Sequence, residues 1–151
     1  MRYWEDFKVG DVTELGSVDV TADEIVEFAT KFDPQPFHVD PKAAETGPFG
    51  GLAASGWHTA ALFMGMFVRG LLLDSASMGS PGIEELRWTA PVRPGDTLTG
   101  RVTVTDVQPS AKNPKRGTVF TTSEVFNQND ELVMTMKARG FFARREPASA
   151  T

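Results

Sequence analysis

The chain has 151 residues, a formal net charge of −5 and a pI of about 5.0. This length corresponds to one domain, and the acidic balance argues against general nucleic-acid binding, which needs a basic field. Cysteine is absent, which excludes disulfides, thiolate nucleophiles and cysteine-ligated metals. The first residues, Met1 to Asp6, lack the apolar run of a signal peptide, so we expect a cytoplasmic protein.

The first half of the chain is predicted to hold a weak strand, a helix and a long loop. Residues 9–20 form the weak strand, which glycines interrupt. Thr21-Ala22-Asp23-Glu24 is a capping box, and apolar residues spaced by three and four predict a helix that stops at Asp33-Pro34. Residues 33–55 are rich in proline and glycine and are predicted to be irregular, apart from a short helix capped by Asp40. Such long connections are usually functional.

The most apolar segment runs from Trp57 to about Leu73, and Ser55-Gly56 is predicted to open a helix there. The segment is slightly short for a membrane span and contains His58 and Arg69. Because it is apolar on nearly every face, we expect a core helix that other elements surround, and no association with a membrane.

The last part of the chain has β patterning. Alternating and β-branched stretches predict four strands, at residues 83–90, 97–108, 118–126 and 132–142. Successive strands with short turns favour an antiparallel sheet. We therefore predict an α+β hotdog fold, a curled antiparallel sheet wrapped around the long apolar helix. Residues 1–143 would form this single domain, and residues 144–151 a flexible tail.

The stretch Asp33-Pro34-Gln35-Pro36-Phe37-His38 is the strongest chemical signal. It sets a carboxylate and an imidazole in a proline-stiffened loop, where they can form an acid–base pair. Simpler interpretations exist for each residue alone, because an aspartate before proline is usually a turn residue and His38 could be a satisfied loop histidine. Their occurrence together favours catalysis.

Structural roles are predicted for the other polar residues near this stretch. Asp40 and Ser55 suit helix N-caps. His58 is expected to pack in its helix or line a pocket. It is not expected to share a metal with His38, because no suitable ligand set accompanies the two histidines, and we predict no metal site.

Three stretches resemble the MaoC-like dehydratases, in the (R)-specific enoyl-CoA hydratase group of the hotdog superfamily. Asp33 to Pro41 is similar to the family pattern Asp-any-Asn-Pro-aliphatic-His-any-Asp-Pro. The stretch Gly50 to Gly56 resembles the glycine-containing entry to the central helix. The stretch Trp88 to Leu98 resembles a strand connection that many hotdog proteins share, thioesterases included. The resemblance spans most of residues 5 to 143.

The resemblance implies roles for individual residues. The family's catalytic aspartate and histidine correspond to Asp33 and His38, and its oxyanion-hole amide to Gly56. Two positions differ, because Gln35 replaces the asparagine and Phe37 replaces an aliphatic residue and would narrow the acyl pocket.

The resemblance also suggests how the substrate is held. Some members place a serine on the central helix beside the aspartate, and here Met64 lies near that position. The phosphates of CoA would need basic partners, for which the candidates are Arg93 and the loop Lys112 to Arg116, although such a loop is more often a solvated hairpin tip. The candidate substrate-binding residues are Gln35, Phe37, Ser55, Trp57 and Arg93.

The implied activity is (R)-specific hydration of trans-2-enoyl-CoA, or the reverse dehydration, by a water held between Asp33 and His38. No metal or redox cofactor is implied, since CoA arrives as part of the substrate, and a homodimer or a dimer of dimers is expected. Two alternatives remain at this point: a hotdog acyl-CoA thioesterase and a non-catalytic acyl-CoA-binding subunit.

Overall fold

The computed structural model describes residues 1–147 of the chain. Strand, helices, long connection, long helix and four further strands follow one another in the predicted order. The elements are η1 (Trp4–Asp6), β1 (Val12–Asp19), α1 (Ala22–Phe32), α2 (Pro36–Val39), α3 (Pro41–Ala44), α4 (Gly56–Gly70), η2 (Leu72–Asp74), β2 (Gly82–Trp88), β3 (Thr97–Pro109), β4 (Arg116–Phe126) and β5 (Leu132–Ala143).

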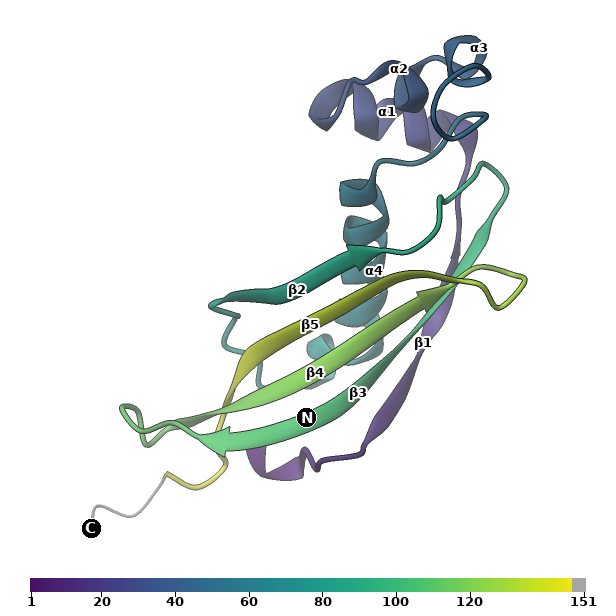
Figure 1. Cartoon of the computed structure of the whole chain (residues 1–151). Helices are drawn as coiled ribbons and strands as arrows, with labels where there is room; N and C mark the ends of the chain where they lie inside the picture. The colour runs from purple at the N-terminus through teal and green to yellow at the C-terminus, as the bar shows by residue number, and fades with distance from the viewer. Residues whose placement is uncertain (148–151) are drawn as a thin grey trace.

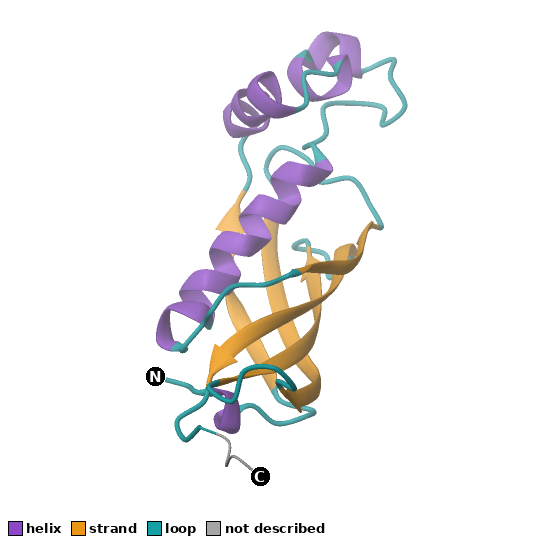
Figure 2. Cartoon of the chain, turned by 90° about the vertical axis from the view of Figure 1, so that its left-hand side faces the viewer, coloured by secondary structure: helices purple, strands orange, loops and turns teal. Residues whose placement is uncertain are grey.

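The five strands form one antiparallel sheet in the order β1-β3-β4-β5-β2, which leaves β1 and β2 at its edges. The sheet curls around one side of α4, and the short helices α1 to α3 lie beyond one end of the sheet (Figures 1 and 2). This arrangement confirms the predicted α+β hotdog fold. The core between helix and sheet is fully apolar at its centre, where Phe63 and Met66 of α4 meet Leu98, Val102 and Val133.

Local signals determine where α1 begins and ends. The hydroxyl of Thr21 accepts a hydrogen bond from the amide of Glu24 at 3.2 Å, which caps the first turn. Ile25 and Ala29 face the core and are buried. The helix stops at Asp33, because the following proline disfavours helical backbone in the residue before it.

The connection between α1 and α4 is more regular than predicted. Two short helices form there, and each begins at a proline: Pro36 in α2 and Pro41 in α3. Proline suits the first helical position, where no backbone N–H is needed. The predicted cap of the second is confirmed: a carboxylate oxygen of Asp40 accepts bonds from the amides of Lys42 and Ala43 at 3.0 and 3.3 Å. A helical turn therefore places His38, and the loop is not wholly irregular.

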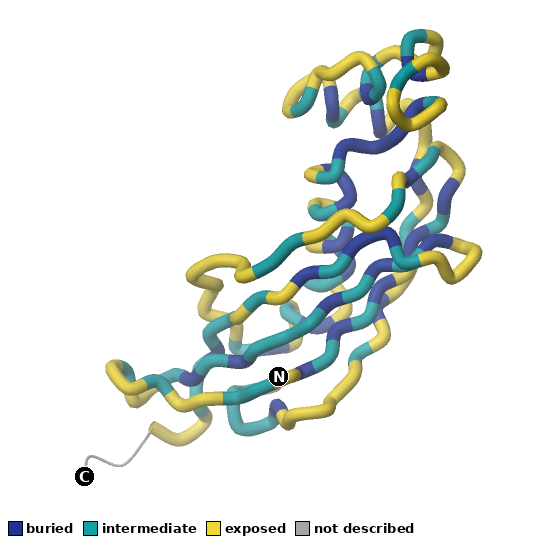
Figure 3. Tube along the Cα trace, viewed as in Figure 1, coloured by how far each residue is buried: buried dark blue, intermediate teal, exposed yellow. Residues whose placement is uncertain are grey.

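The prediction that α4 is surrounded on all sides is wrong. One face is buried, through His58, Thr59, Phe63 and Met66, whereas Trp57 is 58% exposed and Met64 is 47% exposed. The sheet covers one side of the helix only (Figure 3). The stretch Gly56–Asp74 is long and apolar enough for a membrane span by composition, a test that core helices also pass.

The described part of the predicted tail is attached to the N-terminal 3₁₀ turn. The guanidinium of Arg144 lies 3.5 Å from Glu5, and the amide of Arg145 donates to Glu5 at 2.9 Å. Arg145 also pairs with Asp6 at 2.6 Å. The rest of the predicted tail, residues 148–151, lies outside the described residues.

Candidate active site

The two candidate catalytic side chains converge from neighbouring short elements. Asp33 is the C-cap of α1, and His38 lies in the single turn of α2. The imidazole Nε2 is 3.4 Å from Oδ2 of Asp33. The histidine side chain is 6% exposed and the aspartate side chain 19%, so both are largely shielded while solvent still reaches the carboxylate.

The backbone determines which nitrogen of His38 carries hydrogen. Its Nδ1 lies 2.6 Å from the carbonyl oxygen of Ala53. A carbonyl only accepts, so Nδ1 is the donor. Nε2 therefore faces Asp33 with a lone pair in the neutral ring, or with a second N–H in the imidazolium. The loop that leads into α4 thus orients the ring that α2 supplies.

Two neutral donors hold the carboxylate of Asp33. The amide of Gln35 donates to Oδ1 at 2.7 Å, and the hydroxyl of Ser55 donates to Oδ2 at 2.8 Å. Burial raises the pKa of Asp33, but these hydrogen bonds and the charge of His38 lower it by more, so the net shift is downward from the usual 3.8. Asp33 is consequently a carboxylate near neutral pH and is suited to accept a proton.

Ser55 links this carboxylate to the start of α4. It is fully buried, caps the helix by accepting from the amide of Trp57 at 3.3 Å, and donates to Asp33. The predicted cap is confirmed, and the bond to Asp33 is an additional role. Met64, the position that the family pattern indicated for a serine beside the aspartate, is instead on the exposed part of α4.

Gly56 begins α4, so its amide has no partner inside the helix and lies at the positive end of the helix dipole. The reason for glycine is not only the approach of a ligand. A Cβ at this position would lie 2.4 Å from Cε2 of Trp88, because the indole of Trp88 already occupies the space above the glycine. Any side chain here would displace the tryptophan.

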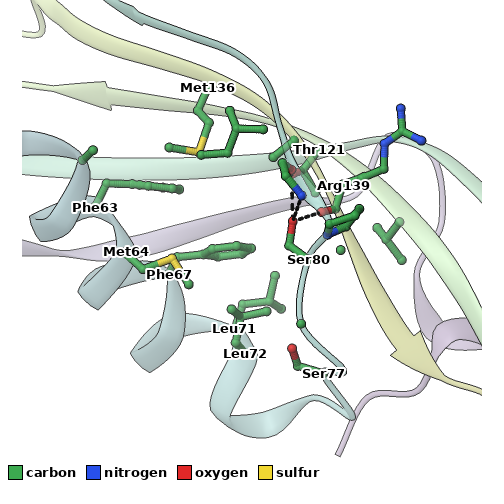
Figure 4. Close-up of a pocket in the computed structure, with 18 of the residues that line it drawn as sticks. Phe63, Met64, Phe67, Leu71, Leu72, Ser77, Ser80, Thr121, Met136 and Arg139 are labelled. Carbon is green, nitrogen blue, oxygen red and sulfur yellow. Dashed lines mark hydrogen bonds between the residues drawn. The ribbon is translucent and has the colours of Figure 1, made fainter. Parts of the chain in front are cut away.

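Two cavities lie along α4. A cavity of about 290 Å³ borders His38 and the start of α4, and the stretch from Trp88 to Val92 forms its opposite wall. A larger cavity of about 570 Å³ runs further along the helix, between α4, the inner strands and the loop that precedes β2 (Figure 4). Its lining is predominantly apolar and includes Phe63, Met64, Phe67 and Met136.

The predicted substrate-binding residues do not all gather at the catalytic pair. Gln35 contacts Asp33 directly. Phe37 packs edge-on against the ring of His38, with centroids 4.6 Å apart, and supports the imidazole. Trp57 lines the larger cavity and meets Trp88 edge to face.

The basic groups predicted for the phosphates of CoA are engaged elsewhere. The guanidinium of Arg93 donates to the carbonyls of Gly51 at 3.1 Å and Leu52 at 3.4 Å, and also to that of Phe49, so it braces the loop before α4. The loop Lys112 to Arg116 is the tip of the β3–β4 hairpin, at the far end of the sheet from α2 (Figure 1). In this chain it is remote from the catalytic pair.

His58 packs as predicted. It is buried, and its ring stacks on Phe28 with centroids 4.7 Å apart and an interplanar angle of 9°. Burial lowers the pKa of His58, only partly opposed by the charge of Glu24. Within residues 1–147, no three His, Asp or Glu side chains are placed to hold a metal ion together.

Residue-level reasoning missed Trp88, Thr59 and the carbonyl of Ala53 as parts of the site. Trp88 begins the stretch Trp88 to Leu98 that resembles a hotdog strand connection, but nothing in the sequence indicated that its ring would lie on Gly56. The role of Ser55 had one local signal, its position next to the candidate oxyanion glycine.

Comparison with known proteins places this geometry in context. A family model described as "MaoC like domain" matches residues 7–126. The crystal structure of a MaoC-like dehydratase from Rhodospirillum rubrum superimposes with a TM-score of 0.86 at 43% identity, covering 95% of this chain and 98% of that one. An (R)-specific enoyl-CoA hydratase from the same organism is 29% identical over 93% of this chain and 95% of the relative. The 3-hydroxyacyl-thioester dehydratase Z of Mycobacterium tuberculosis is 31% identical over 72% and 73%.

Proposed function

Because the chain belongs to the MaoC-like domain family, we propose that it is a lyase that adds water to trans-2-enoyl-CoA thioesters and removes it from (R)-3-hydroxyacyl-CoA thioesters. The observation that carries the proposal is the 3.4 Å approach of Nε2 of His38 to Oδ2 of Asp33, beside a cavity that the first residue of α4 also lines. A single water molecule can contact both groups at that separation.

We propose a division of labour between the two side chains. In hydration, the Asp33 carboxylate accepts a proton from the water as its oxygen bonds to the β carbon, and the His38 imidazolium donates Nε2–H to the α carbon. The lowered pKa keeps Asp33 ionised, which its proposed role as proton acceptor requires, and the Nδ1–H bond to Ala53 leaves Nε2 for the acid. Transfer of the proton from Asp33 to Nε2 then restores the starting state.

The amide of Gly56 would stabilise the enolate-like transition state. Negative charge develops on the thioester oxygen while the α carbon awaits its proton, and an N–H at a helix N-terminus meets that charge. Loss of one such donor typically costs about 10²–10³ in rate. Because Asp33 and His38 flank one water, the oxygen and the proton would reach the same face of the substrate, and addition would be syn.

We further propose a homodimer. Exposed apolar side chains on the edge strand β2 and on α4, namely Ile83, Trp88, Trp57 and Met64, provide a surface for a second copy.

The test is an assay of the purified protein against enoyl-CoA thioesters, following both the enoyl absorbance and thiol release. Loss of absorbance without free thiol supports hydration, whereas thiol release would identify a thioesterase. Asp33→Asn and His38→Ala should each lower kcat/KM by at least about 10³ with the thermal unfolding temperature retained. Near-normal turnover by either variant would remove that residue from the mechanism, and tight binding without turnover by the unaltered protein would indicate a non-catalytic subunit.

A further inference from the structure

The two cavities along α4 have no lining residue in common. Chain neighbours line them separately: Gly56 and Thr59 face the smaller cavity, while Trp57 and Ala60 face the larger one. The smaller cavity lies at the C-terminal end of β2, at Trp88, and the larger cavity reaches the N-terminal end of β2. Both cavities therefore border α4 and β2.

Two tryptophans stand between them. The indole of Trp88 lies flat on Gly56, close enough that a methyl group there would contact three ring carbons at 2.4 to 2.8 Å. Trp57 meets this indole edge to face, with centroids 5.3 Å apart and an interplanar angle of 80°. Trp88 lines the catalytic cavity and Trp57 the larger one, so this contact forms a two-ring wall.

We propose that Trp88 is a specificity-determining residue, whose indole ends the catalytic cavity and restricts the enzyme to short acyl chains. This inference rests on the proposed hydratase function and adds its substrate class. A chain that starts from a thioester carbonyl at Gly56 meets the indole before it reaches the apolar cavity beyond. With the indole in place, only the smaller cavity of about 290 Å³ is available, which is near the lower limit for small-molecule sites.

Both rings of the wall are partly exposed, so either tryptophan can be substituted. In the single chain Trp88 is 43% exposed and Trp57 58% exposed, so neither ring is fixed by the core of its own chain. Trp88 is the last residue of β2 and pairs with Met134 through backbone, which a smaller β-former would keep. Replacing the indole by a small side chain would join the two cavities without removing a group that touches the reacting atoms.

The experiment compares crotonyl-CoA with trans-2-octenoyl-CoA and trans-2-decenoyl-CoA. Trp88→Val should raise the ratio of kcat/KM for the longer substrates over crotonyl-CoA by about tenfold or more, a size typical of discrimination by apolar pockets. Trp88→Phe keeps a ring in the wall and should give a smaller change. Trp4→Phe is the control, because Trp4 of η1 packs on Gly117 of β4 and lines neither cavity, and its ratio should stay at the unaltered value.

An unchanged ratio in a folded Trp88→Val protein overturns the inference, as does an unaltered protein that already prefers decenoyl-CoA. If Trp88→Val does not fold, Trp57→Ala removes the other half of the wall, and the same ratio decides. The saturated thioesters butyryl-CoA and decanoyl-CoA separate this inference from the proposed function, since calorimetry of their binding needs no turnover. A protein that hydrates nothing refutes the function, while the shift in binding ratio still tests the wall.

Discussion

At the scale of single residues, the site depends on which groups donate hydrogen bonds to the carboxylate of Asp33. Gln35 takes one oxygen and Ser55 the other, and the oxygen bonded to Ser55 is the one that faces His38. Ser55 is also the cap of α4, so one hydroxyl links the proposed base to the helix that begins at Gly56. The side chain of Gln35, which replaces the asparagine of the family pattern, reaches Asp33.

Ser55→Ala should lower kcat/KM by about tenfold to a hundredfold, because hydrogen bonds to charged groups contribute about 1.5–3 kcal/mol. The same change removes a donor that keeps the pKa of Asp33 low, so the acidic limb of the pH–rate profile should move to higher pH. Ser123→Ala is the control, since Ser123 is equally buried but lies on β4 outside both cavities. An acidic limb that does not move would argue that the serine acts only as a helix cap.

The lowered pKa of Asp33 also predicts how stability depends on pH. A carboxyl whose pKa falls on folding adds stability above its unfolded pKa, near 3.8, and that stability is lost as pH falls through the lower folded value. The difference in urea-unfolding free energy between the unaltered protein and Asp33→Asn should therefore be constant from pH 6 to 5 and shrink below about pH 4. A difference that grows on acidification would contradict the direction of the shift.

At the scale of elements, the loop before α4 is the part that needs support. It supplies the Ala53 carbonyl to His38, and Arg93 braces it from the strand connection through the carbonyls of Phe49, Gly51 and Leu52. The backbone of Arg93 is itself held, since its amide donates to Asp96 at 2.8 Å. The stretch that resembles a general hotdog connection therefore has a specific task here, which is to hold the loop that orients the imidazole.

Arg93→Ala should lower both the unfolding free energy, by about 1–3 kcal/mol, and kcat, because the unbraced loop releases the Ala53 carbonyl. Arg93→Lys should also have a lower unfolding free energy and a lower kcat than the unaltered protein, since an ammonium cannot reproduce the planar set of donors of a guanidinium. Arg87→Ala is the control, because Arg87 is exposed and pairs with Glu85 at 2.9 Å on the surface of β2. A raised KM for CoA thioesters with unchanged kcat and stability would instead indicate a phosphate contact.

At the scale of the whole molecule, the sheet has two open edges and the central helix has an uncovered side. Ile83 is 53% exposed on β2, and on α4 Trp57 and Met64 are also exposed, which leaves apolar surface along one flank. Open edges and exposed apolar side chains are surfaces on which strands of another copy can pair. The incomplete burial of α4 is consistent with a surface that a second chain completes.

Light scattering on a sizing column should give twice the 16.4 kDa of one chain. Ile83→Lys should shift the protein toward the monomer, because it places a charge on the edge of β2. Val12→Lys makes the same kind of change on β1, the other edge strand, where Val12 is 55% exposed, and should leave the dimer intact. The reverse outcome would assign the interface to β1, and a monomeric unaltered protein would refute the dimer.

The sequence by itself determined what depends on neighbours along the chain. Caps, prolines and apolar spacing are local, so they predicted α1, the start of α4 at Gly56 and the succession of strands. The five-residue interval from Asp33 to His38 likewise predicted a pair that one helical turn brings to 3.4 Å.

The tertiary structure alone decided what depends on residues far apart. Ser55 reaches Asp33 across 22 positions, and Arg93 reaches Phe49 across 44. The indole of Trp88 covers Gly56, and the curl of the sheet leaves one side of α4 uncovered. The spacing of residues along the chain does not predict such contacts. They form only when separate elements, each determined by its own local sequence, pack against one another.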